Sequence, residues 1–351
     1  MTARPGIVER VRDVIDLRFL CLLLAALCGS IALQRPRVVL AQPVYRYVFV
    51  LDITESMNVA DAGLPDASMT RIAFAKAAVT DALTRLRCGS EAGLALFAER
   101  RALLLFAPVE VCAHYGVITS MLDRIDWRLA WRGGSEIAHG LDSAIRMAHA
   151  LGPDTRLVFI TDGHEAPPVH PELRMHLDED AGQTMGVIVG VGGDEPVPIP
   201  VLDEEGKVIG YWQPDQVQQV DSYSLGRGGS ESSEPMTGVD SGDLQTRVAQ
   251  GTEHLSSLHE PYLKELSQEA HLDYQRLRTP RALSEFLVEH RYAHSRDVST
   301  DLGMPLALAA LLGSVGAACT GLFGRRRRSY GVFARFLGGS SHSAGRSHEP
   351  L

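Results

Sequence analysis

The sequence predicts an α/β fold built on a doubly wound, mostly parallel sheet. Short apolar runs alternate with amphipathic segments of helical period along most of the 351 residues, an order typical of a parallel sheet covered by helices on both faces. Polar turns follow several of these runs directly, and in such sheets ligands gather beyond the carboxyl ends of the strands. A hydrophobic content of 45% also excludes a wholly disordered chain.

The first elements show the pattern most clearly. Residues 45–51 form a compact apolar run that predicts a buried strand, and residues 69–86 place Ile72, Val79 and Leu83 on one face of a helix. The later elements are expected as hairpin strands at 94–97 and 102–106, a helix at 137–148, strands at 157–161 and 185–191, a helix at 262–270, a strand at 272–277 and a helix at 281–290.

One region interrupts the alternation. Residues 192–258 are rich in Ser, Gly, Pro and acidic side chains, so we expect a loop insertion there, with a hairpin-like turn at residues 203–206. Within it, residues 213–253 have little apolar content, which predicts a flexible, acidic surface segment.

Two apolar stretches flank the central region. Residues 304–323 contain no charged side chain and match the ~20 residues that a helix needs to cross a bilayer. We therefore expect a transmembrane helix at 303–324, followed by a basic cytoplasmic tail at 325–351 that begins with four arginines. The shorter stretch at 19–34, after a cytoplasmic segment at 1–18, is either an N-terminal transmembrane anchor or the apolar region of a signal peptide.

The distribution of charge agrees with separate compartments. The net charge is −9, but residues 1–42 carry +3 and residues 302–351 carry +5, so the centre carries −17. No basic face dominates the chain, which argues against a nucleic-acid partner. We expect residues 43–293 to form an exported domain.

Oxygen-bearing side chains occur where three of the predicted elements meet their loops. Asp52, Thr54 and Ser56 form a D-x-T-x-S turn after the first strand, Ser135 lies in the loop before a helix, and Asp162 follows another strand. All five are hard oxygen ligands that suit Mg²⁺ or Ca²⁺ rather than zinc. The alternative interpretation is that they are ordinary turn and cap residues.

With these residues in this order, the sequence resembles the von Willebrand factor A family over roughly residues 44–289. The resemblance implies a doubly wound sheet with a metal-ion-dependent adhesion site and a protein partner that donates an acidic residue to the metal. A narrower resemblance, to the exported MxaL-like proteins of bacterial methanol-oxidation clusters, is carried by ITESMN at 53–58, PVEVC at 108–112, LAWRGGSEIAHGL at 129–141 and TDGHEAPP at 161–168.

The family resemblance also implies roles for the five residues. Ser56, Thr54 and Ser135 would lie in or near the first coordination shell, and one position would stay free for the partner's carboxylate. Asp52 and Asp162 would act mainly through bound waters. Thr54 stands where the family usually has Ser, and Ser135 where it usually has Thr, so both positions keep a hydroxyl.

The narrower resemblance implies a location and a role. The domain would be periplasmic and anchored in a bacterial inner membrane, with the C-terminal tail in the cytoplasm. The protein would assist maturation of a quinoprotein methanol dehydrogenase, including insertion of its Ca²⁺, and methanol dehydrogenase or its assembly proteins would be the partners.

The sequence gives little support for catalysis. It contains no G-x-S-x-G, no Walker sequence and no C-x-x-C pair. Hydroxyl-rich metal sites favour binding, whereas water activation usually recruits His or several direct carboxylates. We expect a binding module that is not an enzyme; the alternatives are a metal-dependent hydrolase using the same site and a scaffold that holds Ca²⁺. The histidines after Asp162, namely His164, His170 and His176, are expected to be solvated.

Two further expectations concern cysteines and helix packing. Cys88 and Cys112 both lie in the exported segment, which predicts a disulfide between them, whereas Cys21, Cys28 and Cys319 lie in apolar stretches and should stay reduced. Small residues recur every four positions in the last apolar stretch, which predicts that this helix packs against another helix. They are Ala309, Gly313, Ala317 and Gly321.

Overall fold

The structure is a computed structural model that describes residues 7–64, 67–131, 133–169, 174–177, 184–219 and 252–336. The chain divides into two compact units. One consists of Met1–Ala41 together with Asp297–Leu351, and the other of Gln42–Arg296.

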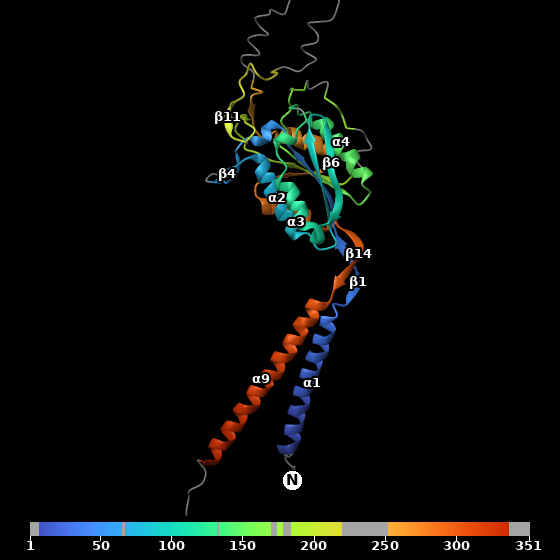
Figure 1. Cartoon of the computed structure of the whole chain (residues 1–351), viewed down its shortest axis with the longest axis vertical. Helices are drawn as coiled ribbons and strands as arrows, with labels where there is room; N and C mark the ends of the chain where they lie inside the picture. Colours follow the sequence, from blue (N-terminus) through green and yellow to red (C-terminus); the bar gives the residue numbers. More distant parts are fainter. Residues whose placement is uncertain are drawn as a thin grey trace, which may run out of the picture. The chain divides into compact units, whose positions relative to one another are not determined.

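The larger unit is built on a six-stranded sheet in the order β13-β8-β7-β2-β5-β6 (Figure 1). Its strands are β2 (Arg46–Asp52), β5 (Glu91–Ala98), β6 (Arg101–Glu110), β7 (Arg156–Thr161), β8 (Gly186–Gly190) and β13 (Asp273–Arg276). All neighbours are parallel except β5 and β6, which form the predicted antiparallel hairpin at one edge. The prediction of a mostly parallel α/β sheet is therefore confirmed.

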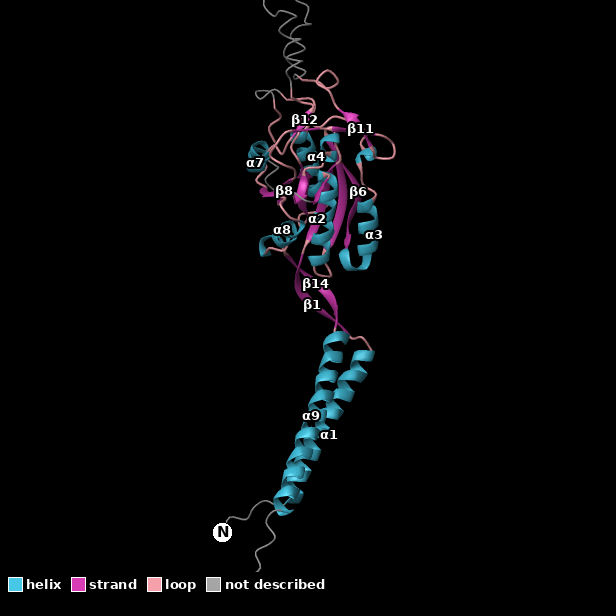
Figure 2. Cartoon of the chain, turned by 90° about the vertical axis from the view of Figure 1, so that its left-hand side faces the viewer, coloured by secondary structure: helices cyan, strands magenta, loops and turns pink. Residues whose placement is uncertain are grey.

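Helices cover both faces of this sheet (Figure 2). On one face lie α2 (Arg71–Arg85), α3 (Val111–Asp123) and α8 (Pro280–Leu287), and on the other lie α4 (Ile137–Ala150) and α7 (Glu260–Glu269). Side chains of the central strand β2 contact the helices on both faces, because successive side chains of a strand point to opposite faces of the sheet. Tyr47 and Phe49 pack with the first group of helices, and Val48 and Val50 with the second.

Each predicted strand and helix of the sheet is present, and α3 is an element that the sequence pattern did not predict. A disulfide joins Cys88, which follows α2, to Cys112 in the first turn of α3, with 5.2 Å between the Cα atoms. The predicted disulfide is therefore confirmed, and Cys21, Cys28 and Cys319 are free as expected.

The insertion forms two short pairs of strands. β9 (Val197–Pro198) pairs with β12 (Leu255–Ser256), and β10 (Pro200–Leu202) pairs with β11 (Val208–Tyr211). The predicted turn lies between β10 and β11, where the Gly206 amide donates to the Asp203 carbonyl at 2.9 Å. Residues 220–251, which make up most of the segment predicted to be flexible, lie outside the described residues.

Several shorter elements complete the described chain. They are β1 (Arg37–Val44), which pairs with β14 (His294–Asp301); β3 (Ala62–Leu64), which pairs with β4 (Ala67–Met69); and the 3-10 turns η1 (Glu55–Asn58), η2 (Trp127–Leu129) and η5 (His290–Tyr292).

The smaller unit contains two helices that lie side by side, α1 (Ile7–Leu33) and α9 (Gly303–Phe336) (Figures 1 and 2). Their backbones approach closely at Gly313, where an added Cβ would lie 3.2 Å from Cβ of Ala25 and 3.4 Å from the carbonyl oxygen of Cys21. Ala317, one turn further on, is also buried. The prediction that the last helix packs against another helix is confirmed, and Gly313 and Ala317 lie at the contact. Of the other two small residues, Ala309 is exposed and Gly321 lies outside the described side chains.

Among the described residues, no helix is both long and apolar enough to cross a membrane. In α1 the apolar run between Arg18 and Gln34 is shorter than the ~20 residues that a bilayer requires. In α9 the side chains are described only as far as Cys319. The described residues thus contain no spanning helix within 19–34 or 303–319, and the rest of the span expected at 303–324 lies outside the described side chains.

Candidate metal centre

The predicted site residues meet at the carboxyl edge of the sheet. Asp52 is the last residue of β2, and Asp162 follows directly after β7, the parallel neighbour of β2. After β2 the chain passes through α2 to β5, which lies next to β2 on one side in the sheet. The strand β7 lies next to β2 on the opposite side. Such a change of direction leaves a crevice beyond the strand ends, where open α/β sheets bind ligands.

Asp52 is fully buried, and both of its oxygens are held by neighbouring donors. Its Oδ1 accepts from the amide of Thr54 at 2.9 Å and from the Thr54 hydroxyl at 2.6 Å, while its Oδ2 accepts from the Thr161 hydroxyl at 2.6 Å. Burial and, secondly, the nearby charge of Asp162 raise the pKa of Asp52 above its ordinary range. An ionised Asp52 therefore calls for additional positive charge nearby.

Asp162 already has a cationic partner. Its Oδ1 accepts from the amide of His164 at 2.9 Å, and its Oδ2 lies 2.5 Å from Nη1 of Arg71. Burial alone would raise the pKa of Asp162, but the guanidinium of Arg71, together with the nearby His164 ring and hydrogen bonds from the His164 amide and the Ser56 side chain, holds this pKa below its ordinary value. Asp162 is therefore the anionic member of a buried ion pair.

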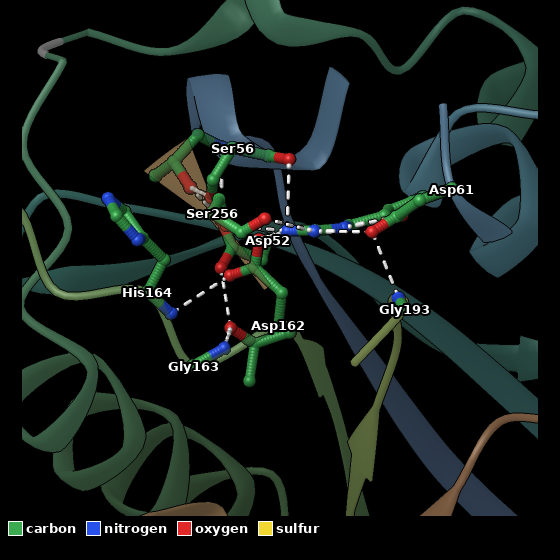
Figure 3. Close-up of polar contacts among 11 residues, drawn as sticks. Asp52, Ser56, Asp61, Asp162, Gly163, His164, Gly193 and Ser256 are labelled. Carbon is green, nitrogen blue, oxygen red and sulfur yellow. Dashed lines mark hydrogen bonds and ion pairs between the residues drawn. The ribbon is translucent and has the colours of Figure 1, made fainter. Parts of the chain in front are cut away.

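Arg71 is fully buried at the start of α2 and holds a second carboxylate. Its Nε and Nη2 donate to the two oxygens of Asp61 at 2.8 and 2.6 Å, and its Nη1 donates to the Ser256 hydroxyl at 2.6 Å. Figure 3 shows Asp61 and Asp162 in this network. Glycine is required at residue 192, because its φ is +135° and a Cβ would lie 2.8 Å from Nε of Arg71.

Three hydroxyl groups lie beside the two carboxylates. The hydroxyl oxygens of Thr54 and Ser56 are 3.4 Å apart, and both side chains are buried. Ser135 is held by its backbone, whose amide donates to the Ala166 carbonyl at 2.6 Å and whose carbonyl accepts from the Ala166 amide at 2.8 Å. Its hydroxyl is buried without a hydrogen-bond partner among the described residues.

Thr54, Ser56 and Ser135 line one pocket of about 300 Å³. Asp52 and Asp162 are fully buried and do not line it, so a cation in this pocket would meet the hydroxyls directly and the carboxylates through water. This all-oxygen set fits Mg²⁺ or Ca²⁺. The structure thus brings all five predicted residues to one edge of the sheet.

A second potential ligand cluster is already used. In the described ranges, three cysteine, histidine or acidic groups come within metal-binding distance of one another only at Cys88, Glu110 and Cys112. Because the two cysteines form the disulfide, this group offers no pair of thiolates. The hydroxyl-lined pocket remains the candidate metal centre.

Sequence reasoning missed three residues near this pocket. His164 was expected to be solvated but is only 4% exposed, its Nδ1 has no partner in the described structure, and burial lowers its pKa to about 4. Glu165 accepts from the Tyr262 hydroxyl at 2.5 Å, and burial raises its pKa to about 7. Arg71 is the third. His176 is exposed as expected, and His170 lies outside the described residues.

One signal for Arg71 was present in the sequence. It occupies the first turn of α2, where the helix dipole disfavours a cation, so a compensating acid was to be expected. His164 gave no such signal, because loop histidines are usually solvated.

Comparisons with known proteins agree with this description. Residues 47–164 match the von Willebrand factor type A domain family. No curated protein sequence matches the chain.

Several solved structures are similar to the chain. BatB from Bacteroides thetaiotaomicron is 19% identical with a TM-score of 0.46, covering 70% of this chain and 98% of that chain. An aerotolerance-related membrane protein from Bacteroides fragilis is 17% identical with a TM-score of 0.42, covering 69% and 96%. A von Willebrand factor type A protein from Catenulispora acidiphila is 12% identical with a TM-score of 0.36, covering 76% and 43%.

Proposed function

We propose that this von Willebrand factor type A domain is a binding module that takes up Mg²⁺ or Ca²⁺ in its hydroxyl-lined pocket and engages an acidic side chain of a protein partner through the ion. The observation that carries the proposal is the hydroxyl of Ser135, buried in the pocket with no partner among the described residues. A buried hydroxyl without a partner costs about 1–3 kcal/mol, which a bound cation would offset.

The charges around the pocket explain why an external acid would bind. Arg71 compensates Asp162, so a divalent cation would find one carboxylate, Asp52, without a counterion among its described contacts. The hydroxyls that line the pocket are neutral. An ion held in this way keeps much of its positive charge and attracts a carboxylate from outside.

The same features support binding rather than catalysis, and we propose that the protein is not an enzyme. Activation of a metal-bound water usually relies on histidine ligands or several direct carboxylates. Here Asp52 and Asp162 are fully buried and engaged by protein donors. The pocket itself is lined by three hydroxyls, by one histidine (His164) and by the carboxylates of Glu55 and Glu253.

The experiment that tests this proposal is calorimetric titration of the metal-free protein with Ca²⁺ and Mg²⁺, in the original chain and in Ser135→Ala. The substitution removes a ligand but also removes the unpartnered hydroxyl. We expect Ca²⁺ affinity to fall tenfold or more while the stability of the metal-free protein stays the same or rises by up to about 1 kcal/mol.

Ser90→Ala is the matched control. Ser90 is equally buried, but its hydroxyl accepts from the Tyr45 amide at 3.2 Å, at the far end of β2 from Asp52. We expect Ser90→Ala to lower stability by about 1 kcal/mol and to leave metal affinity unchanged. Unaltered Ca²⁺ binding by Ser135→Ala would refute the proposed site.

Two narrower parts of the proposal concern place and partner. The Cys88–Cys112 disulfide supports export, because disulfides persist in oxidising compartments. The resemblance to the MxaL-like group supports a partner in the maturation of a quinoprotein methanol dehydrogenase. In a methanol-oxidising host, Ser135→Ala should then leave that dehydrogenase poor in Ca²⁺; normal Ca²⁺ content and activity would remove the maturation role and leave the metal site untouched.

A further inference from the structure

We propose that the pocket selects an acidic side chain whose neighbour in the partner is aromatic or a long apolar residue, a specificity that rests on the function proposed above. One side of the pocket carries the hydroxyls of Thr54, Ser56 and Ser135. Another is an apolar wall supplied by the insertion. This apolar wall consists of Ile199, Trp212 and Val217.

Backbone hydrogen bonds within the insertion hold the apolar wall in place. The amide of Ile199 donates to the carbonyl of His254 at 3.1 Å, and the amide of Trp212 donates to the carbonyl of Ile199 at 3.0 Å. The insertion strand β10 also packs against η1, which contains Ser56. Wall and metal ligands therefore hold fixed positions relative to each other, as selection between similar side chains requires.

The strand β11, which directly precedes Trp212, also exposes apolar side chains. Val208, Ile209 and Tyr211 are 46%, 65% and 52% exposed. Neighbouring apolar side chains left open to water on one short strand are typical of a protein-interaction surface. These side chains add exposed apolar surface to the insertion that supplies the apolar wall.

His164 supplies a polar anchor beside the apolar wall. Its side chain is only 4% exposed, borders the pocket and leaves Nδ1 without a partner among the described residues. Its ring points away from the Asp162 carboxylate (Figure 3). A carboxylate has two oxygens, and while the cation holds one, the imidazole can donate to the other.

Two acidic residues on the same pocket make the cation indispensable. Glu55 and Glu253 both line it, and their charges repel an incoming carboxylate when no metal is present. Apolar contact alone would admit an uncharged peptide as readily as an acidic one. The combination predicts that binding needs the metal, the acid and the apolar neighbour together.

Fluorescence anisotropy with three labelled peptides tests this specificity on the full chain loaded with Ca²⁺. The peptides are flanked by glycines and contain Glu-Phe, Glu-Gly or Gln-Phe at the centre. We expect Glu-Phe to bind at least tenfold more tightly than Glu-Gly, and we expect no binding of Gln-Phe or of any peptide in EDTA.

Substitutions assign the selectivity to individual residues. Trp212→Ala should bring the affinity for Glu-Phe down to that for Glu-Gly without changing the affinity for Ca²⁺. Trp131→Ala, which removes a 39% exposed tryptophan that does not line the pocket, should change neither. His164→Ala should weaken both acidic peptides by the same factor, threefold or more.

The outcomes separate this inference from the proposed function. Equal binding of Glu-Phe and Glu-Gly, or undiminished preference in Trp212→Ala, would overturn the selectivity while leaving metal-dependent binding of acids intact. Binding of Gln-Phe, or of Glu-Phe in EDTA, would show an apolar pocket that needs neither acid nor metal. If Ca²⁺ binds but neither acidic peptide does, the proposed function itself fails and this inference fails with it.

Discussion

Replacing Arg71 by methionine should destabilise the domain far more than removing an exposed charge from its surface. The guanidinium lies between two carboxylates, 2.5 Å from Asp162 and 2.8 and 2.6 Å from the two oxygens of Asp61. Methionine keeps much of the side-chain volume but removes the charge and every donor. Asp162, which is fully buried, would then lack its cationic partner.

The size of the effect follows from burial. Removing one partner of a buried ion pair costs about 3–5 kcal/mol, because the remaining charge is left without compensation. We expect the upper part of this range, since two carboxylates lose the same partner. Arg85→Met, on the same helix, is the control: Arg85 pairs with Asp81 at 3.1 Å, and both side chains are about one-third exposed, so the cost should be no more than ~0.5 kcal/mol.

Urea unfolding monitored by circular dichroism measures both variants, first in EDTA and then in saturating Ca²⁺. A divalent cation in the neighbouring pocket would supply part of the lost positive charge, so the loss in Arg71→Met should be smaller with Ca²⁺ than without it. A loss below ~1 kcal/mol in EDTA, or equal losses for Arg71→Met and Arg85→Met, would refute the reasoning.

The ion pair between Arg71 and Asp162 makes the stability of the domain depend on pH. Because Arg71 holds the pKa of Asp162 below its ordinary value, the stabilisation is complete above the usual aspartate pKa of about 3.9 and is lost as the pH falls through the lower pKa of the folded state. Arg71→Met should lack this acid-dependent loss. A stability profile between pH 2 and 6 that is identical in both proteins would contradict the ion pair.

Three other predictions concern separate parts of the fold. Reducing the Cys88–Cys112 disulfide, whose cysteines are 24 positions apart, should lower the unfolding free energy by about 3 kcal/mol in urea titrations with and without reductant. Gly140→Val should destabilise by at least 1–3 kcal/mol on the same assay, because a Cβ there would overlap the buried ring of Phe97. Burial raises the pKa of Glu165 to about 7. The free energy of unfolding should therefore fall by on the order of 2 kcal/mol as the pH rises from the usual glutamate pKa of about 4.3 towards 7. Glu165→Gln should flatten this dependence on pH.

Each of these predictions has a clear contrary result. Unchanged stability on reduction would mean that the disulfide does not restrict the unfolded chain. For the packing prediction, Gly133→Ala is the control, since no atom lies within 4 Å of the added Cβ, and equal effects at the two glycines would contradict the clash. A pH slope that Glu165→Gln leaves unaltered would assign the proton to another group.

The central sheet and the position of the five candidate site residues at its edge could be predicted from the sequence, because both leave local signals. The run of residues 46–52 is apolar and compact, and the D-x-T-x-S turn follows it directly. Parallel neighbours then bring Asp52 and Asp162 to the same edge, whatever the detailed packing.

The features that the sequence did not predict depend on contacts between distant segments or on weak local patterns. Arg71 contacts Asp162, which lies 91 positions away, and its burial could not be inferred from α2 alone. The helix α3 was missed because its outer surface is partly apolar: Val117 is 63% exposed, while Ile118 and Leu122 face the core. The burial of His164 depends partly on His259, whose ring centre is 5.7 Å away and which precedes a helix far along the chain.

An anomalous difference map from crystals of the chain grown with Mn²⁺, a divalent ion that also prefers oxygen ligands, would locate a bound metal directly. We expect one strong peak within coordination distance of the hydroxyl oxygens of Ser56 and Ser135, with Asp52 and Asp162 reached through waters. The peak should be absent in Ser135→Ala crystals soaked at the same concentration. A crystal of the original chain with no peak in this pocket, or with Mn²⁺ bound only elsewhere, would contradict the claim that these residues form a metal centre.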